Sequence, residues 1–389
     1  MSYGPPRGKR ELDAFTAIFA QSFNVPSDRA ALWMGRAKRQ ELRVLRRGGS
    51  VVAGLVILPM GQWYGGRVVP MAGIAAVGVE PDQRASGAGS ELMRETLKEL
   101  HRRGVATSTL YPATVPVYRR VGYEHAGTWL NYRLATRLIA ERDRGLTVRR
   151  AKASDRGAMM ALYTARARTR AGLADRRDYL WTRVFEPTIG TKAHGYVVER
   201  KGRIEGYTFF YQQANDKKHF DLYTTDWVAA TPDATRRLLA FFASHRSLAD
   251  DVIWQGGPTE PLFLITSEHE AKVDRFVRWM TRIVDVKRAL ESRGYAETVD
   301  VEAHLDVRDE LLSGNHGRFV ATIRGGRAAV RRGGGGRVQL TINGLASLFT
   351  GYAAPAELVV AGLMSGPDSD LGALQAAFAG PAPHLTDFF

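Results

Sequence analysis

The sequence predicts an α/β (α+β) protein of three domains, and three observations carry this prediction. Residues 1–145 combine apolar strand-like runs with amphipathic helix-like runs. The order of strand, turn and helix starts again near residue 146. The pattern changes near residue 295, where short strand-like runs and glycine clusters take over. Because 389 residues are too many for one compact core, we expect domains at 1–145, 146–290 and 291–389.

The elements expected in the first domain follow from periodicity and turn residues. Apolar residues at three- and four-residue spacing predict helices, while continuous or alternating apolar runs between glycine pairs predict an antiparallel meander. The expected order is helices at 11–23 and 27–37, strands at 41–47, 50–60 and 68–81, a helix at 90–104, a strand at 105–113, a short helix at 115–122 and a strand at 123–135.

The second domain is predicted to repeat the first. We expect a strand at 146–150, a helix beginning at Ser154 and Asp155, a hairpin turning at Lys201-Gly202, and a strand, turn and helix over 219–245. The last of these repeats the order of residues 71–101. In the third domain, the sequence RRGGGGR at 331–337 is expected to be a hairpin turn without a function of its own.

Composition excludes several classes of protein. The chain is 44% hydrophobic and 24% charged, as ordinary globular proteins are, and no apolar run reaches the roughly 18–20 residues of a membrane helix. No apolar stretch follows the basic residues near the N-terminus, so no secretory signal is expected. The absence of cysteine excludes disulfides, thiolate ligands and a cysteine nucleophile, and it agrees with a cytoplasmic location.

The net charge of +15 predicts an affinity for anions: nucleic acid, acidic membranes or a phosphate-bearing cofactor. Arginine richness can also reflect genome composition, and no zinc-finger spacing or basic-aromatic RNA motif favours nucleic acid. The nine histidines are scattered without H-x-x-x-H or H-E-x-x-H pairs, so we expect no metal site.

A glycine-containing turn after the third strand is the first candidate site. It reads Arg84-Ala85-Ser86-Gly87-Ala88-Gly89-Ser90 and joins the strand containing Val77-Gly78-Val79 to the helix at 90–104. Backbone N–H groups at the start of a helix converge on one point, and the helix dipole adds positive charge there. Gly87 and Gly89 would let the backbone approach a phosphate, and Arg84 would add charge. The corresponding turn in the second domain, AATPDA, has no such pattern.

The second candidate is Tyr118, 29 residues beyond Gly89 in the short helix at 115–122. A phenol with a pKa of about 10 can donate a proton to a leaving thiolate. The alternative is an aromatic side chain that packs under the helix, and this is the role we assign to Tyr123.

These segments resemble the GNAT acetyltransferase superfamily, and over nearly its full length the chain resembles the Eis-like (enhanced intracellular survival) branch. The turn matches the pattern Q/R-x-x-G-x-G/A, and Tyr118 lies in a segment of the form Y-x-x-x-G-F/Y. The resemblance implies tandem GNAT folds, the second degenerate and cofactor-free, followed by a sterol-carrier-like domain. It implies acetyl-CoA as acyl donor, held by Val77, Gly78, Val79 and residues 84–90, with Tyr118 as general acid.

The resemblance further implies that the terminal carboxylate, here that of Phe389, enters the first domain as general base. The alternative is a frayed tail, against which the pair Phe388-Phe389 argues. The expected acceptors are primary amines, including aminoglycosides and lysine side chains of peptides or proteins, with direct attack in a ternary complex. Phe23, Trp33 and Met34 are candidates for the acceptor side, or for the core. A homo-oligomer, a hexamer as in relatives, is implied by resemblance alone.

Two other functions stay open from the sequence. The chain could be a non-catalytic carrier of an apolar ligand through its third domain, or a basic factor associated with nucleic acid. A carrier would co-purify with a hydrophobic ligand and show no dependence on Tyr118, and a nucleic-acid binder would show salt-sensitive retention on DNA.

Overall fold

The architecture comes from a computed structural model, which describes residues 1–187, 191–216, 219–266 and 271–389. The chain forms two compact units. The first contains residues 1–127, 278–381 and 389, and the second contains residues 128–277 and 382–388. Each unit is described by itself. No helix among the described residues is long and apolar enough to cross a membrane.

The N-terminal part of the first unit is a mixed sheet with helices on both faces. Its strands pair in the order β1-β2-β3-β4-β5-β12, antiparallel except for the parallel pair β4–β5. Its elements are β1 (Ser2–Gly4), α1 (Lys9–Phe23), α2 (Ser27–Arg36), β2 (Leu42–Arg47), β3 (Ser50–Tyr64), β4 (Arg67–Val79), α3 (Ala88–Arg102), β5 (Thr107–Leu110), α4 (Val115–Arg119), β6 (Glu124–Ala135) and β12 (Lys272–Ile283). Strands β6 and β12 belong in part to each unit.

The two tight turns of the meander depend on glycine. Gly48-Gly49 and Gly65-Gly66 all have positive φ, between 56° and 84°. Such pairs form the turns whose twist matches a two-residue hairpin. The predicted order of helices and strands is confirmed in this region. The structure adds the short strand β1, which the sequence pattern did not reveal, and it extends β3 to Tyr64.

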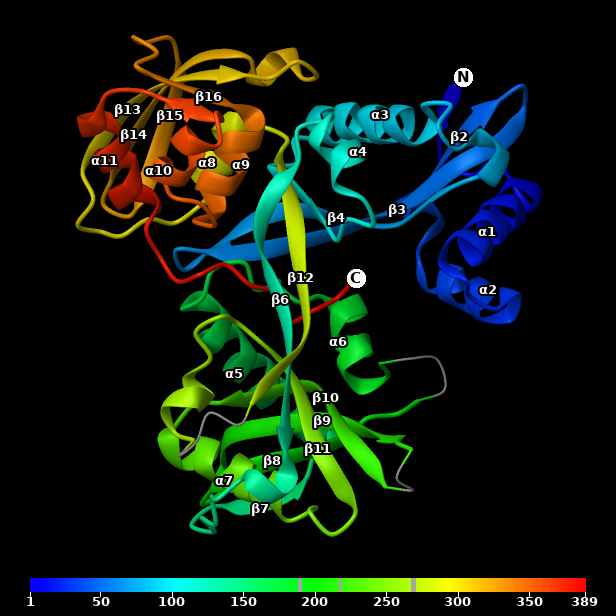
Figure 1. The fold of residues 1–389 in the computed structure, drawn as a ribbon, viewed down its shortest axis with the longest axis vertical. Helices are drawn as coiled ribbons and strands as arrows, with labels where there is room; N and C mark the ends of the chain where they lie inside the picture. Colours follow the sequence, from blue (N-terminus) through cyan, green and yellow to red (C-terminus); the bar gives the residue numbers. More distant parts are fainter. Residues whose placement is uncertain (188–190, 217–218, 267–270) are drawn as a thin grey trace. The chain divides into compact units, whose positions relative to one another are not determined.

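Different helices cover the two faces of this sheet. Figure 1 shows α3 and α4 on one side of the long strands β3 and β4, and α1 and α2 on the other. The core on the α3 side contains Ile57, Ile74, Leu92 and Leu97, all at most 2% exposed. On the α1 side, the ring of Phe15 lies so close to Gly54 that a Cβ there would come within 2.4 Å of it. That glycine therefore lets α1 pack directly on the sheet.

A five-stranded sheet with four helices forms the C-terminal part of the first unit. The strand order is β15-β14-β13-β16-β17. The elements are α8 (Val286–Ser292), β13 (Val301–Arg308), β14 (Gly317–Arg324), β15 (Arg327–Arg332), β16 (Val338–Thr341), α9 (Ile342–Thr350), α10 (Pro355–Val360), β17 (Met364–Ser365) and α11 (Asp368–Phe378).

The glycine run at 331–337 is not the hairpin turn that the sequence predicted. Strand β15 pairs with β14, whereas β16 pairs with β13 in a parallel direction, so the run carries the chain across β14 and β13. A Cβ on Gly334 would lie 2.4 Å from Val320 of β14 and 2.8 Å from His304 of β13. Glycine is needed because the segment crosses close over the sheet. The hairpin itself turns at Gly325-Gly326, both at positive φ.

The second unit repeats the mixed sheet, with strands in the order β6-β11-β10-β9-β8-β7. The hairpin predicted at Lys201-Gly202 is confirmed, as is the strand, turn and helix of 219–245. Besides β6, the elements are β7 (Thr147–Arg150), α5 (Arg156–Arg168), α6 (Asp178–Phe185), β8 (His194–Arg200), β9 (Arg203–Ala214), β10 (Phe220–Ala229), α7 (Pro232–Ala243) and β11 (Ala249–Gly256).

Candidate active site

Strands β4 and β5 separate at one end, and this leaves a backbone edge open. They pair only from Met71 with Thr107 to Ile74 with Leu110, where β5 ends. Strand β4 continues to Val79, and its other edge stays paired with β3. Beyond Ile74, the edge of β4 that faced β5 has no strand partner among the described residues. Val77, Gly78 and Val79, which the family resemblance implies hold acetyl-CoA, lie in this stretch.

A bulge in β4 accompanies the separation. Val56 pairs with Ala75 and Gly54 with Gly78, so β4 has one more residue than β3 between these two pairs. Ala76 adopts a left-handed φ of 53°, which is costly for a residue with a side chain. An extra residue bends and twists the strand that carries it. The bulge thus accounts for the departure of β4 from β5.

The turn after β4 presents free N–H groups at the start of α3. Gly87 precedes the helix with a φ of 84°, and Ala85 also has a positive φ of 62°. Within the described chain, the N–H groups of Gly87, Ala88, Gly89 and Ser90 have no hydrogen-bond partner. A Cβ on Gly87 would meet nothing within 4 Å, so protein packing does not explain the glycine.

Two arginines flank this turn, and the sequence pattern indicated only Arg84. The Arg84 guanidinium is exposed and has no ion-pair partner in the described residues. Arg47, at the end of β2, donates to Gln83 Oε1 (2.8 Å) and to Ser86 Oγ (3.1 Å) and so fixes the turn from a distant segment. The only sequence signal for Arg47 was its place at the end of a strand, which is not specific.

A partly buried ionic contact holds α3 in place. Glu99 of α3 accepts hydrogen bonds from the Arg43 Nε atom (2.6 Å) and the Tyr3 hydroxyl (2.8 Å), which belong to β2 and β1. The orientation of the turn therefore depends on two strands that precede it.

Tyr118 lies in α4 with its ring in the core that also contains α3. Its side chain is 6% exposed, and its hydroxyl has no hydrogen-bond partner among the described residues. Burial raises the pKa of the phenol to about 12, so Tyr118 stays protonated over the neutral range. Tyr123 differs, because its hydroxyl bonds to Ser108 Oγ at 2.7 Å and the residue is fully buried. The packing role predicted for Tyr123 agrees with these contacts.

Phe389 packs against the strands that carry the open edge. Its ring lies 5.5 Å from that of Tyr111, which follows β5, at an interplanar angle of 63°. A Cβ on Gly73 would come within 2.9 Å of the Phe389 ring and 2.7 Å of Met60 Sδ. Phe389 is 7% exposed, so the side chain is held rather than frayed. Neither Gly73 nor Tyr111 could have been linked to the tail by sequence pattern.

Tyr118 and Phe389 lie on opposite faces of the sheet. Neighbouring residues on a strand point to opposite faces. Ala72 and Ile74 belong to the core that contains Tyr118, whereas Gly73, between them, contacts Phe389. The separated strands lie between the two candidate catalytic residues.

The acceptor-side candidates divide into core and surface. Met34 is 3% exposed and belongs to the core, whereas Phe23 is 45% exposed. Trp33 stacks on Phe19 with ring centroids 4.9 Å apart, and Phe19 contacts Phe23 at 5.0 Å. Among the described residues, no group of three or more histidine, cysteine, aspartate or glutamate side chains could hold a metal ion.

Comparison with known families identifies the class. Two models described as "Acetyltransferase (GNAT) domain" match residues 6–126 and 172–283, and a "Sterol carrier protein domain" model matches residues 286–386. The fold and these matches define the chain as an N-acetyltransferase with tandem GNAT folds and a sterol-carrier-like domain.

Solved structures and curated relatives then give the family. A GCN5-related N-acetyltransferase from Anabaena variabilis is 34% identical with a TM-score of 0.96, covering all of both chains. One from Kribbella flavida is 30% identical with a TM-score of 0.88, covering 100% of this chain and 98% of the other. The N-acetyltransferase Eis of Mycobacterium tuberculosis is 27% identical over 95% of each chain. The chain belongs to the GCN5-related N-acetyltransferase family, in its Eis-like branch.

Proposed function

We propose that the protein transfers an acetyl group from acetyl-CoA to a primary amine, by direct attack of the amine on the thioester in a ternary complex. The observation that carries this proposal is the open edge of β4, which leads into a turn with free N–H groups. A pantetheine arm has peptide-like amides that can pair with such an edge. The diphosphate would meet the N–H groups of residues 87–90, with charge from Arg84 and Arg47.

Tyr118 is proposed as the general acid. Expulsion of CoA from the tetrahedral centre produces a thiolate, which a nearby phenol can protonate. Two observations support this role: the hydroxyl has no partner in the described residues, and its raised pKa keeps the proton available. The same raised pKa argues against Tyr118 as a base at neutral pH.

The α-carboxylate of Phe389 is proposed as the proton acceptor for the amine. The position of Phe389 on the face opposite Tyr118 supports this role. The proton donor, Tyr118, and the proton acceptor, the Phe389 carboxylate, would then reach the space between β4 and β5 from opposite faces of the sheet. A carboxylate is a weak base toward an ammonium ion. Proton transfer through water, or attack by the neutral fraction of the amine, would lessen this mismatch.

The proposed acceptors are amines of broad type, including aminoglycosides and lysine side chains. The aromatic residues Phe23 and Trp33 on α1 and α2 offer an apolar and polarisable surface to a cation. The Eis-like relatives also lead us to propose a homo-oligomer, a hexamer, which light scattering of the purified protein would measure.

The proposal assigns one active site to each chain. In the second unit, α7 begins after Thr231, whose hydroxyl donates to Glu205 at 2.9 Å, and Asp233 lies in the first turn. Arg200 pairs with both carboxylates, and Thr231 Oγ1 accepts a hydrogen bond from the Ala234 N–H group at 3.1 Å, so groups of the chain itself occupy the start of α7. In the core of the second unit, apolar side chains from β10, α7 and β11, including Trp227, Trp254 and Phe242, leave a cavity of only about 10 Å³. This volume is too small for the pantetheine arm of a cofactor.

The alternative of an apolar-ligand carrier receives no support from the cavity described in the C-terminal domain. That cavity, of about 510 Å³, has walls of mixed character, with Asp306, Arg308, His316 and Gln339 beside Leu340, Leu363 and Met364. A carrier site for an apolar ligand would have mainly hydrophobic walls.

A matched pair of glycine variants tests the donor site. Gly89 lies in the first turn of α3, where a Cβ would approach only Val79, at an ordinary 3.4 Å. Gly372 lies in α11, where a Cβ would meet nothing within 4 Å. Replacing either by alanine should raise stability by up to about 1 kcal/mol. Only Gly89→Ala should raise KM for acetyl-CoA, since its methyl group would intrude on the diphosphate.

The assay is release of CoA thiol from acetyl-CoA in the presence of an amine such as kanamycin. Tyr118→Phe should lower kcat by about 100-fold or more with little change in melting temperature. Deleting Phe389, or adding one residue after it, should have a similar effect if its free carboxylate accepts the proton. The proposal fails if acetyl-CoA neither raises the melting temperature nor yields thiol with any of a panel of amines.

A further inference from the structure

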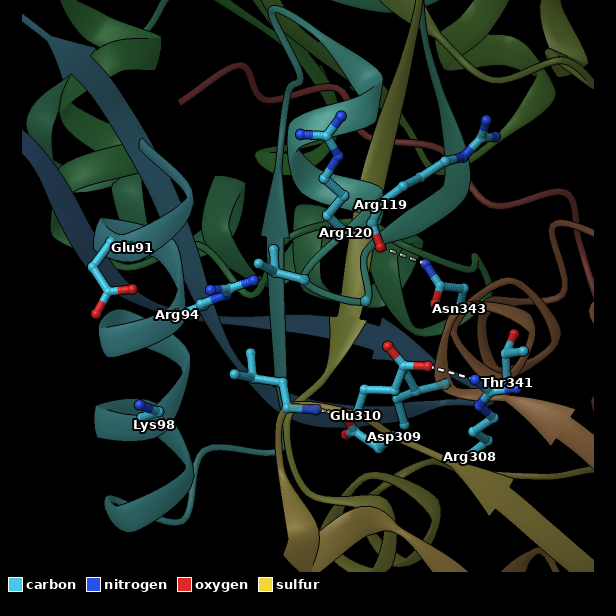
Figure 2. A pocket seen from close by; sticks show the side chains of 14 residues that line it. Glu91, Arg94, Lys98, Arg119, Arg120, Arg308, Asp309, Glu310, Thr341 and Asn343 are labelled. Atoms are coloured by element: carbon cyan, nitrogen blue, oxygen red, sulfur yellow. Dashed lines mark hydrogen bonds and ion pairs between the residues drawn. The ribbon is translucent and has the colours of Figure 1, made fainter. Parts of the chain in front are cut away.

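A second cavity in the first unit lies beside the donor turn. It has a volume of about 680 Å³ and is shown in Figure 2. Its walls come from one face of α3, the turn after α4, the segment after β13 and the start of α9. The lining residues are Glu91, Arg94, Lys98, residues 119–122, residues 308–311 and residues 341–343.

Two arginines at this cavity lack a partner. Arg119 pairs with Glu124 at 2.7 Å, Lys98 with Glu95 at 2.7 Å and Arg308 with Glu310 at 2.6 Å. Arg94 and Arg120, by contrast, make no ion pair or hydrogen bond with any described residue. Both are exposed to the cavity, and each guanidinium can bind a phosphate through two parallel hydrogen bonds.

The acidic residues at the cavity do not cancel this charge. Asp309 is buried and paired with Arg282, whose side chain is 0% exposed. Glu310 is paired with Arg308, which leaves only Glu91 to oppose the two free arginines. In Figure 2, the guanidinium group of Arg94 extends from α3 into the cavity. Glu91 also lines the cavity, so two unpaired guanidinium groups face one carboxylate. The field in the cavity therefore favours an anion.

The free arginines lie close to the donor turn. An α-helix rises 1.5 Å per residue, so Arg94 is about 7–8 Å along α3 from Gly89. Helical side chains also tilt toward the N-terminus, which brings the Arg94 guanidinium back toward the turn. Figure 2 shows Arg120 extending toward the end of the cavity at which α3 begins. A group joined to a diphosphate by a single sugar can reach both arginines.

We infer that this cavity binds a phosphate monoester, namely the 3′-phosphate of acetyl-CoA, through Arg94 and Arg120. The inference rests on the proposed function, because it requires the diphosphate of the donor at the turn of residues 84–90. A phosphate monoester carries up to two negative charges at neutral pH, whereas each phosphorus of the diphosphate carries one. The charge of two unpaired guanidinium groups matches such a ligand.

The test compares CoA with 3′-dephospho-CoA by calorimetric binding to the full chain. The wild type should bind CoA at least about 10-fold more tightly. Arg94→Gln combined with Arg120→Gln should remove most of this preference and leave the affinity for 3′-dephospho-CoA nearly unchanged. Arg102→Gln removes the same charge from an exposed position of α3 outside the cavity, and it should keep the preference.

Three results would overturn the inference. The wild type could bind both ligands equally, or the double variant could lose affinity for both by the same factor, as a general change of charge would cause. Inorganic phosphate could raise the melting temperature through Arg94 and Arg120 while the two coenzymes still bound equally, which would assign the cavity to a separate anion. The proposed function fails separately, if neither acetyl-CoA nor its 3′-dephospho form yields thiol.

Discussion

Replacing Gly73 by alanine should displace the C-terminal residue from the proposed catalytic site while leaving the fold intact. Gly73 lies in β4, and the Phe389 ring covers it. An alanine Cβ would lie 2.9 Å and 3.1 Å from two atoms of that ring and 2.7 Å from Met60 Sδ. Carbon atoms in proteins pack at about 3.5–4.0 Å, so the ring would have to withdraw by roughly 1 Å. The strand is hydrogen-bonded on both sides at this point, so the terminal residue should move.

The size of the effect follows from this displacement. Overpacking of this kind costs about 1–3 kcal/mol. A free-energy cost of about 1.4 kcal/mol corresponds to a tenfold change in an equilibrium constant. If the whole overpacking cost shifts the Phe389 carboxylate out of its catalytic position, kcat/KM should therefore fall by roughly 5- to 150-fold. A misplacement of about 1 Å at a catalytic group can by itself cost about 100-fold. The melting temperature should change by only a few degrees.

Thiol release measured in two backgrounds checks the reasoning. Gly73→Ala should lower kcat/KM in the full chain but add little in a variant that lacks Phe389, because the two changes then act through one residue. An equal loss in both backgrounds would show that Gly73 acts through the sheet and not through the tail. Wild-type activity of Gly73→Ala would refute the packing argument outright.

Two further predictions concern the tail residues in the second unit. Arg176 is 7% exposed and pairs with Asp387 at 2.9 Å and also with Asp226. Arg176→Met removes the guanidinium that these two buried carboxylates share, and it should cost about 3–5 kcal/mol, or roughly 6–20 °C in melting temperature. An unchanged melting curve would contradict the role of this cluster. Burial lowers the pKa of His384 to about 4, against about 6.5 in an unfolded chain. The unfolded state therefore binds a proton that the native state refuses, and stability should fall by up to about 3 kcal/mol as the pH drops from 6.5 to 4. His384→Gln should flatten this part of the profile, and an unaltered slope would assign it to other groups.

Local sequence was sufficient for the elements of the proposed donor site. A strand, a glycine-containing turn and an amphipathic helix are encoded by residues that are neighbours in the chain, so periodicity and turn chemistry revealed β4, the turn at 84–90 and α3. The same holds for Tyr118 in its short helix. The glycine run at 331–337 shows the limit, because glycine signals a special backbone but not which strands it joins.

The domain boundaries at 145 and 290 remain a prediction, since the compact units divide the chain differently. The strand pairing shows why a pattern along the chain could not reveal this. Met280–Ile283 of β12 pair with β5 of the first unit, and Leu130–Ala135 of β6 pair with β11 of the second. Such pairings join residues more than 100 positions apart, and no local signal specifies them.

The sequence by itself predicted the repeated architecture and the strand, turn and helix of the proposed donor site, because each depends on residue types at short, regular spacing. Its resemblance to the GNAT superfamily implied the class of enzyme. Only the tertiary structure decided that β4 and β5 separate beyond Ile74, that Phe389 covers Gly73, and that Arg94 and Arg120 face one cavity with no ion-pair partner in the described part of the chain. The physical reason is that each of these features is a group that the rest of the fold leaves without a partner: a strand edge, a glycine face and two guanidinium charges. Each exists only once all other contacts of the fold have formed.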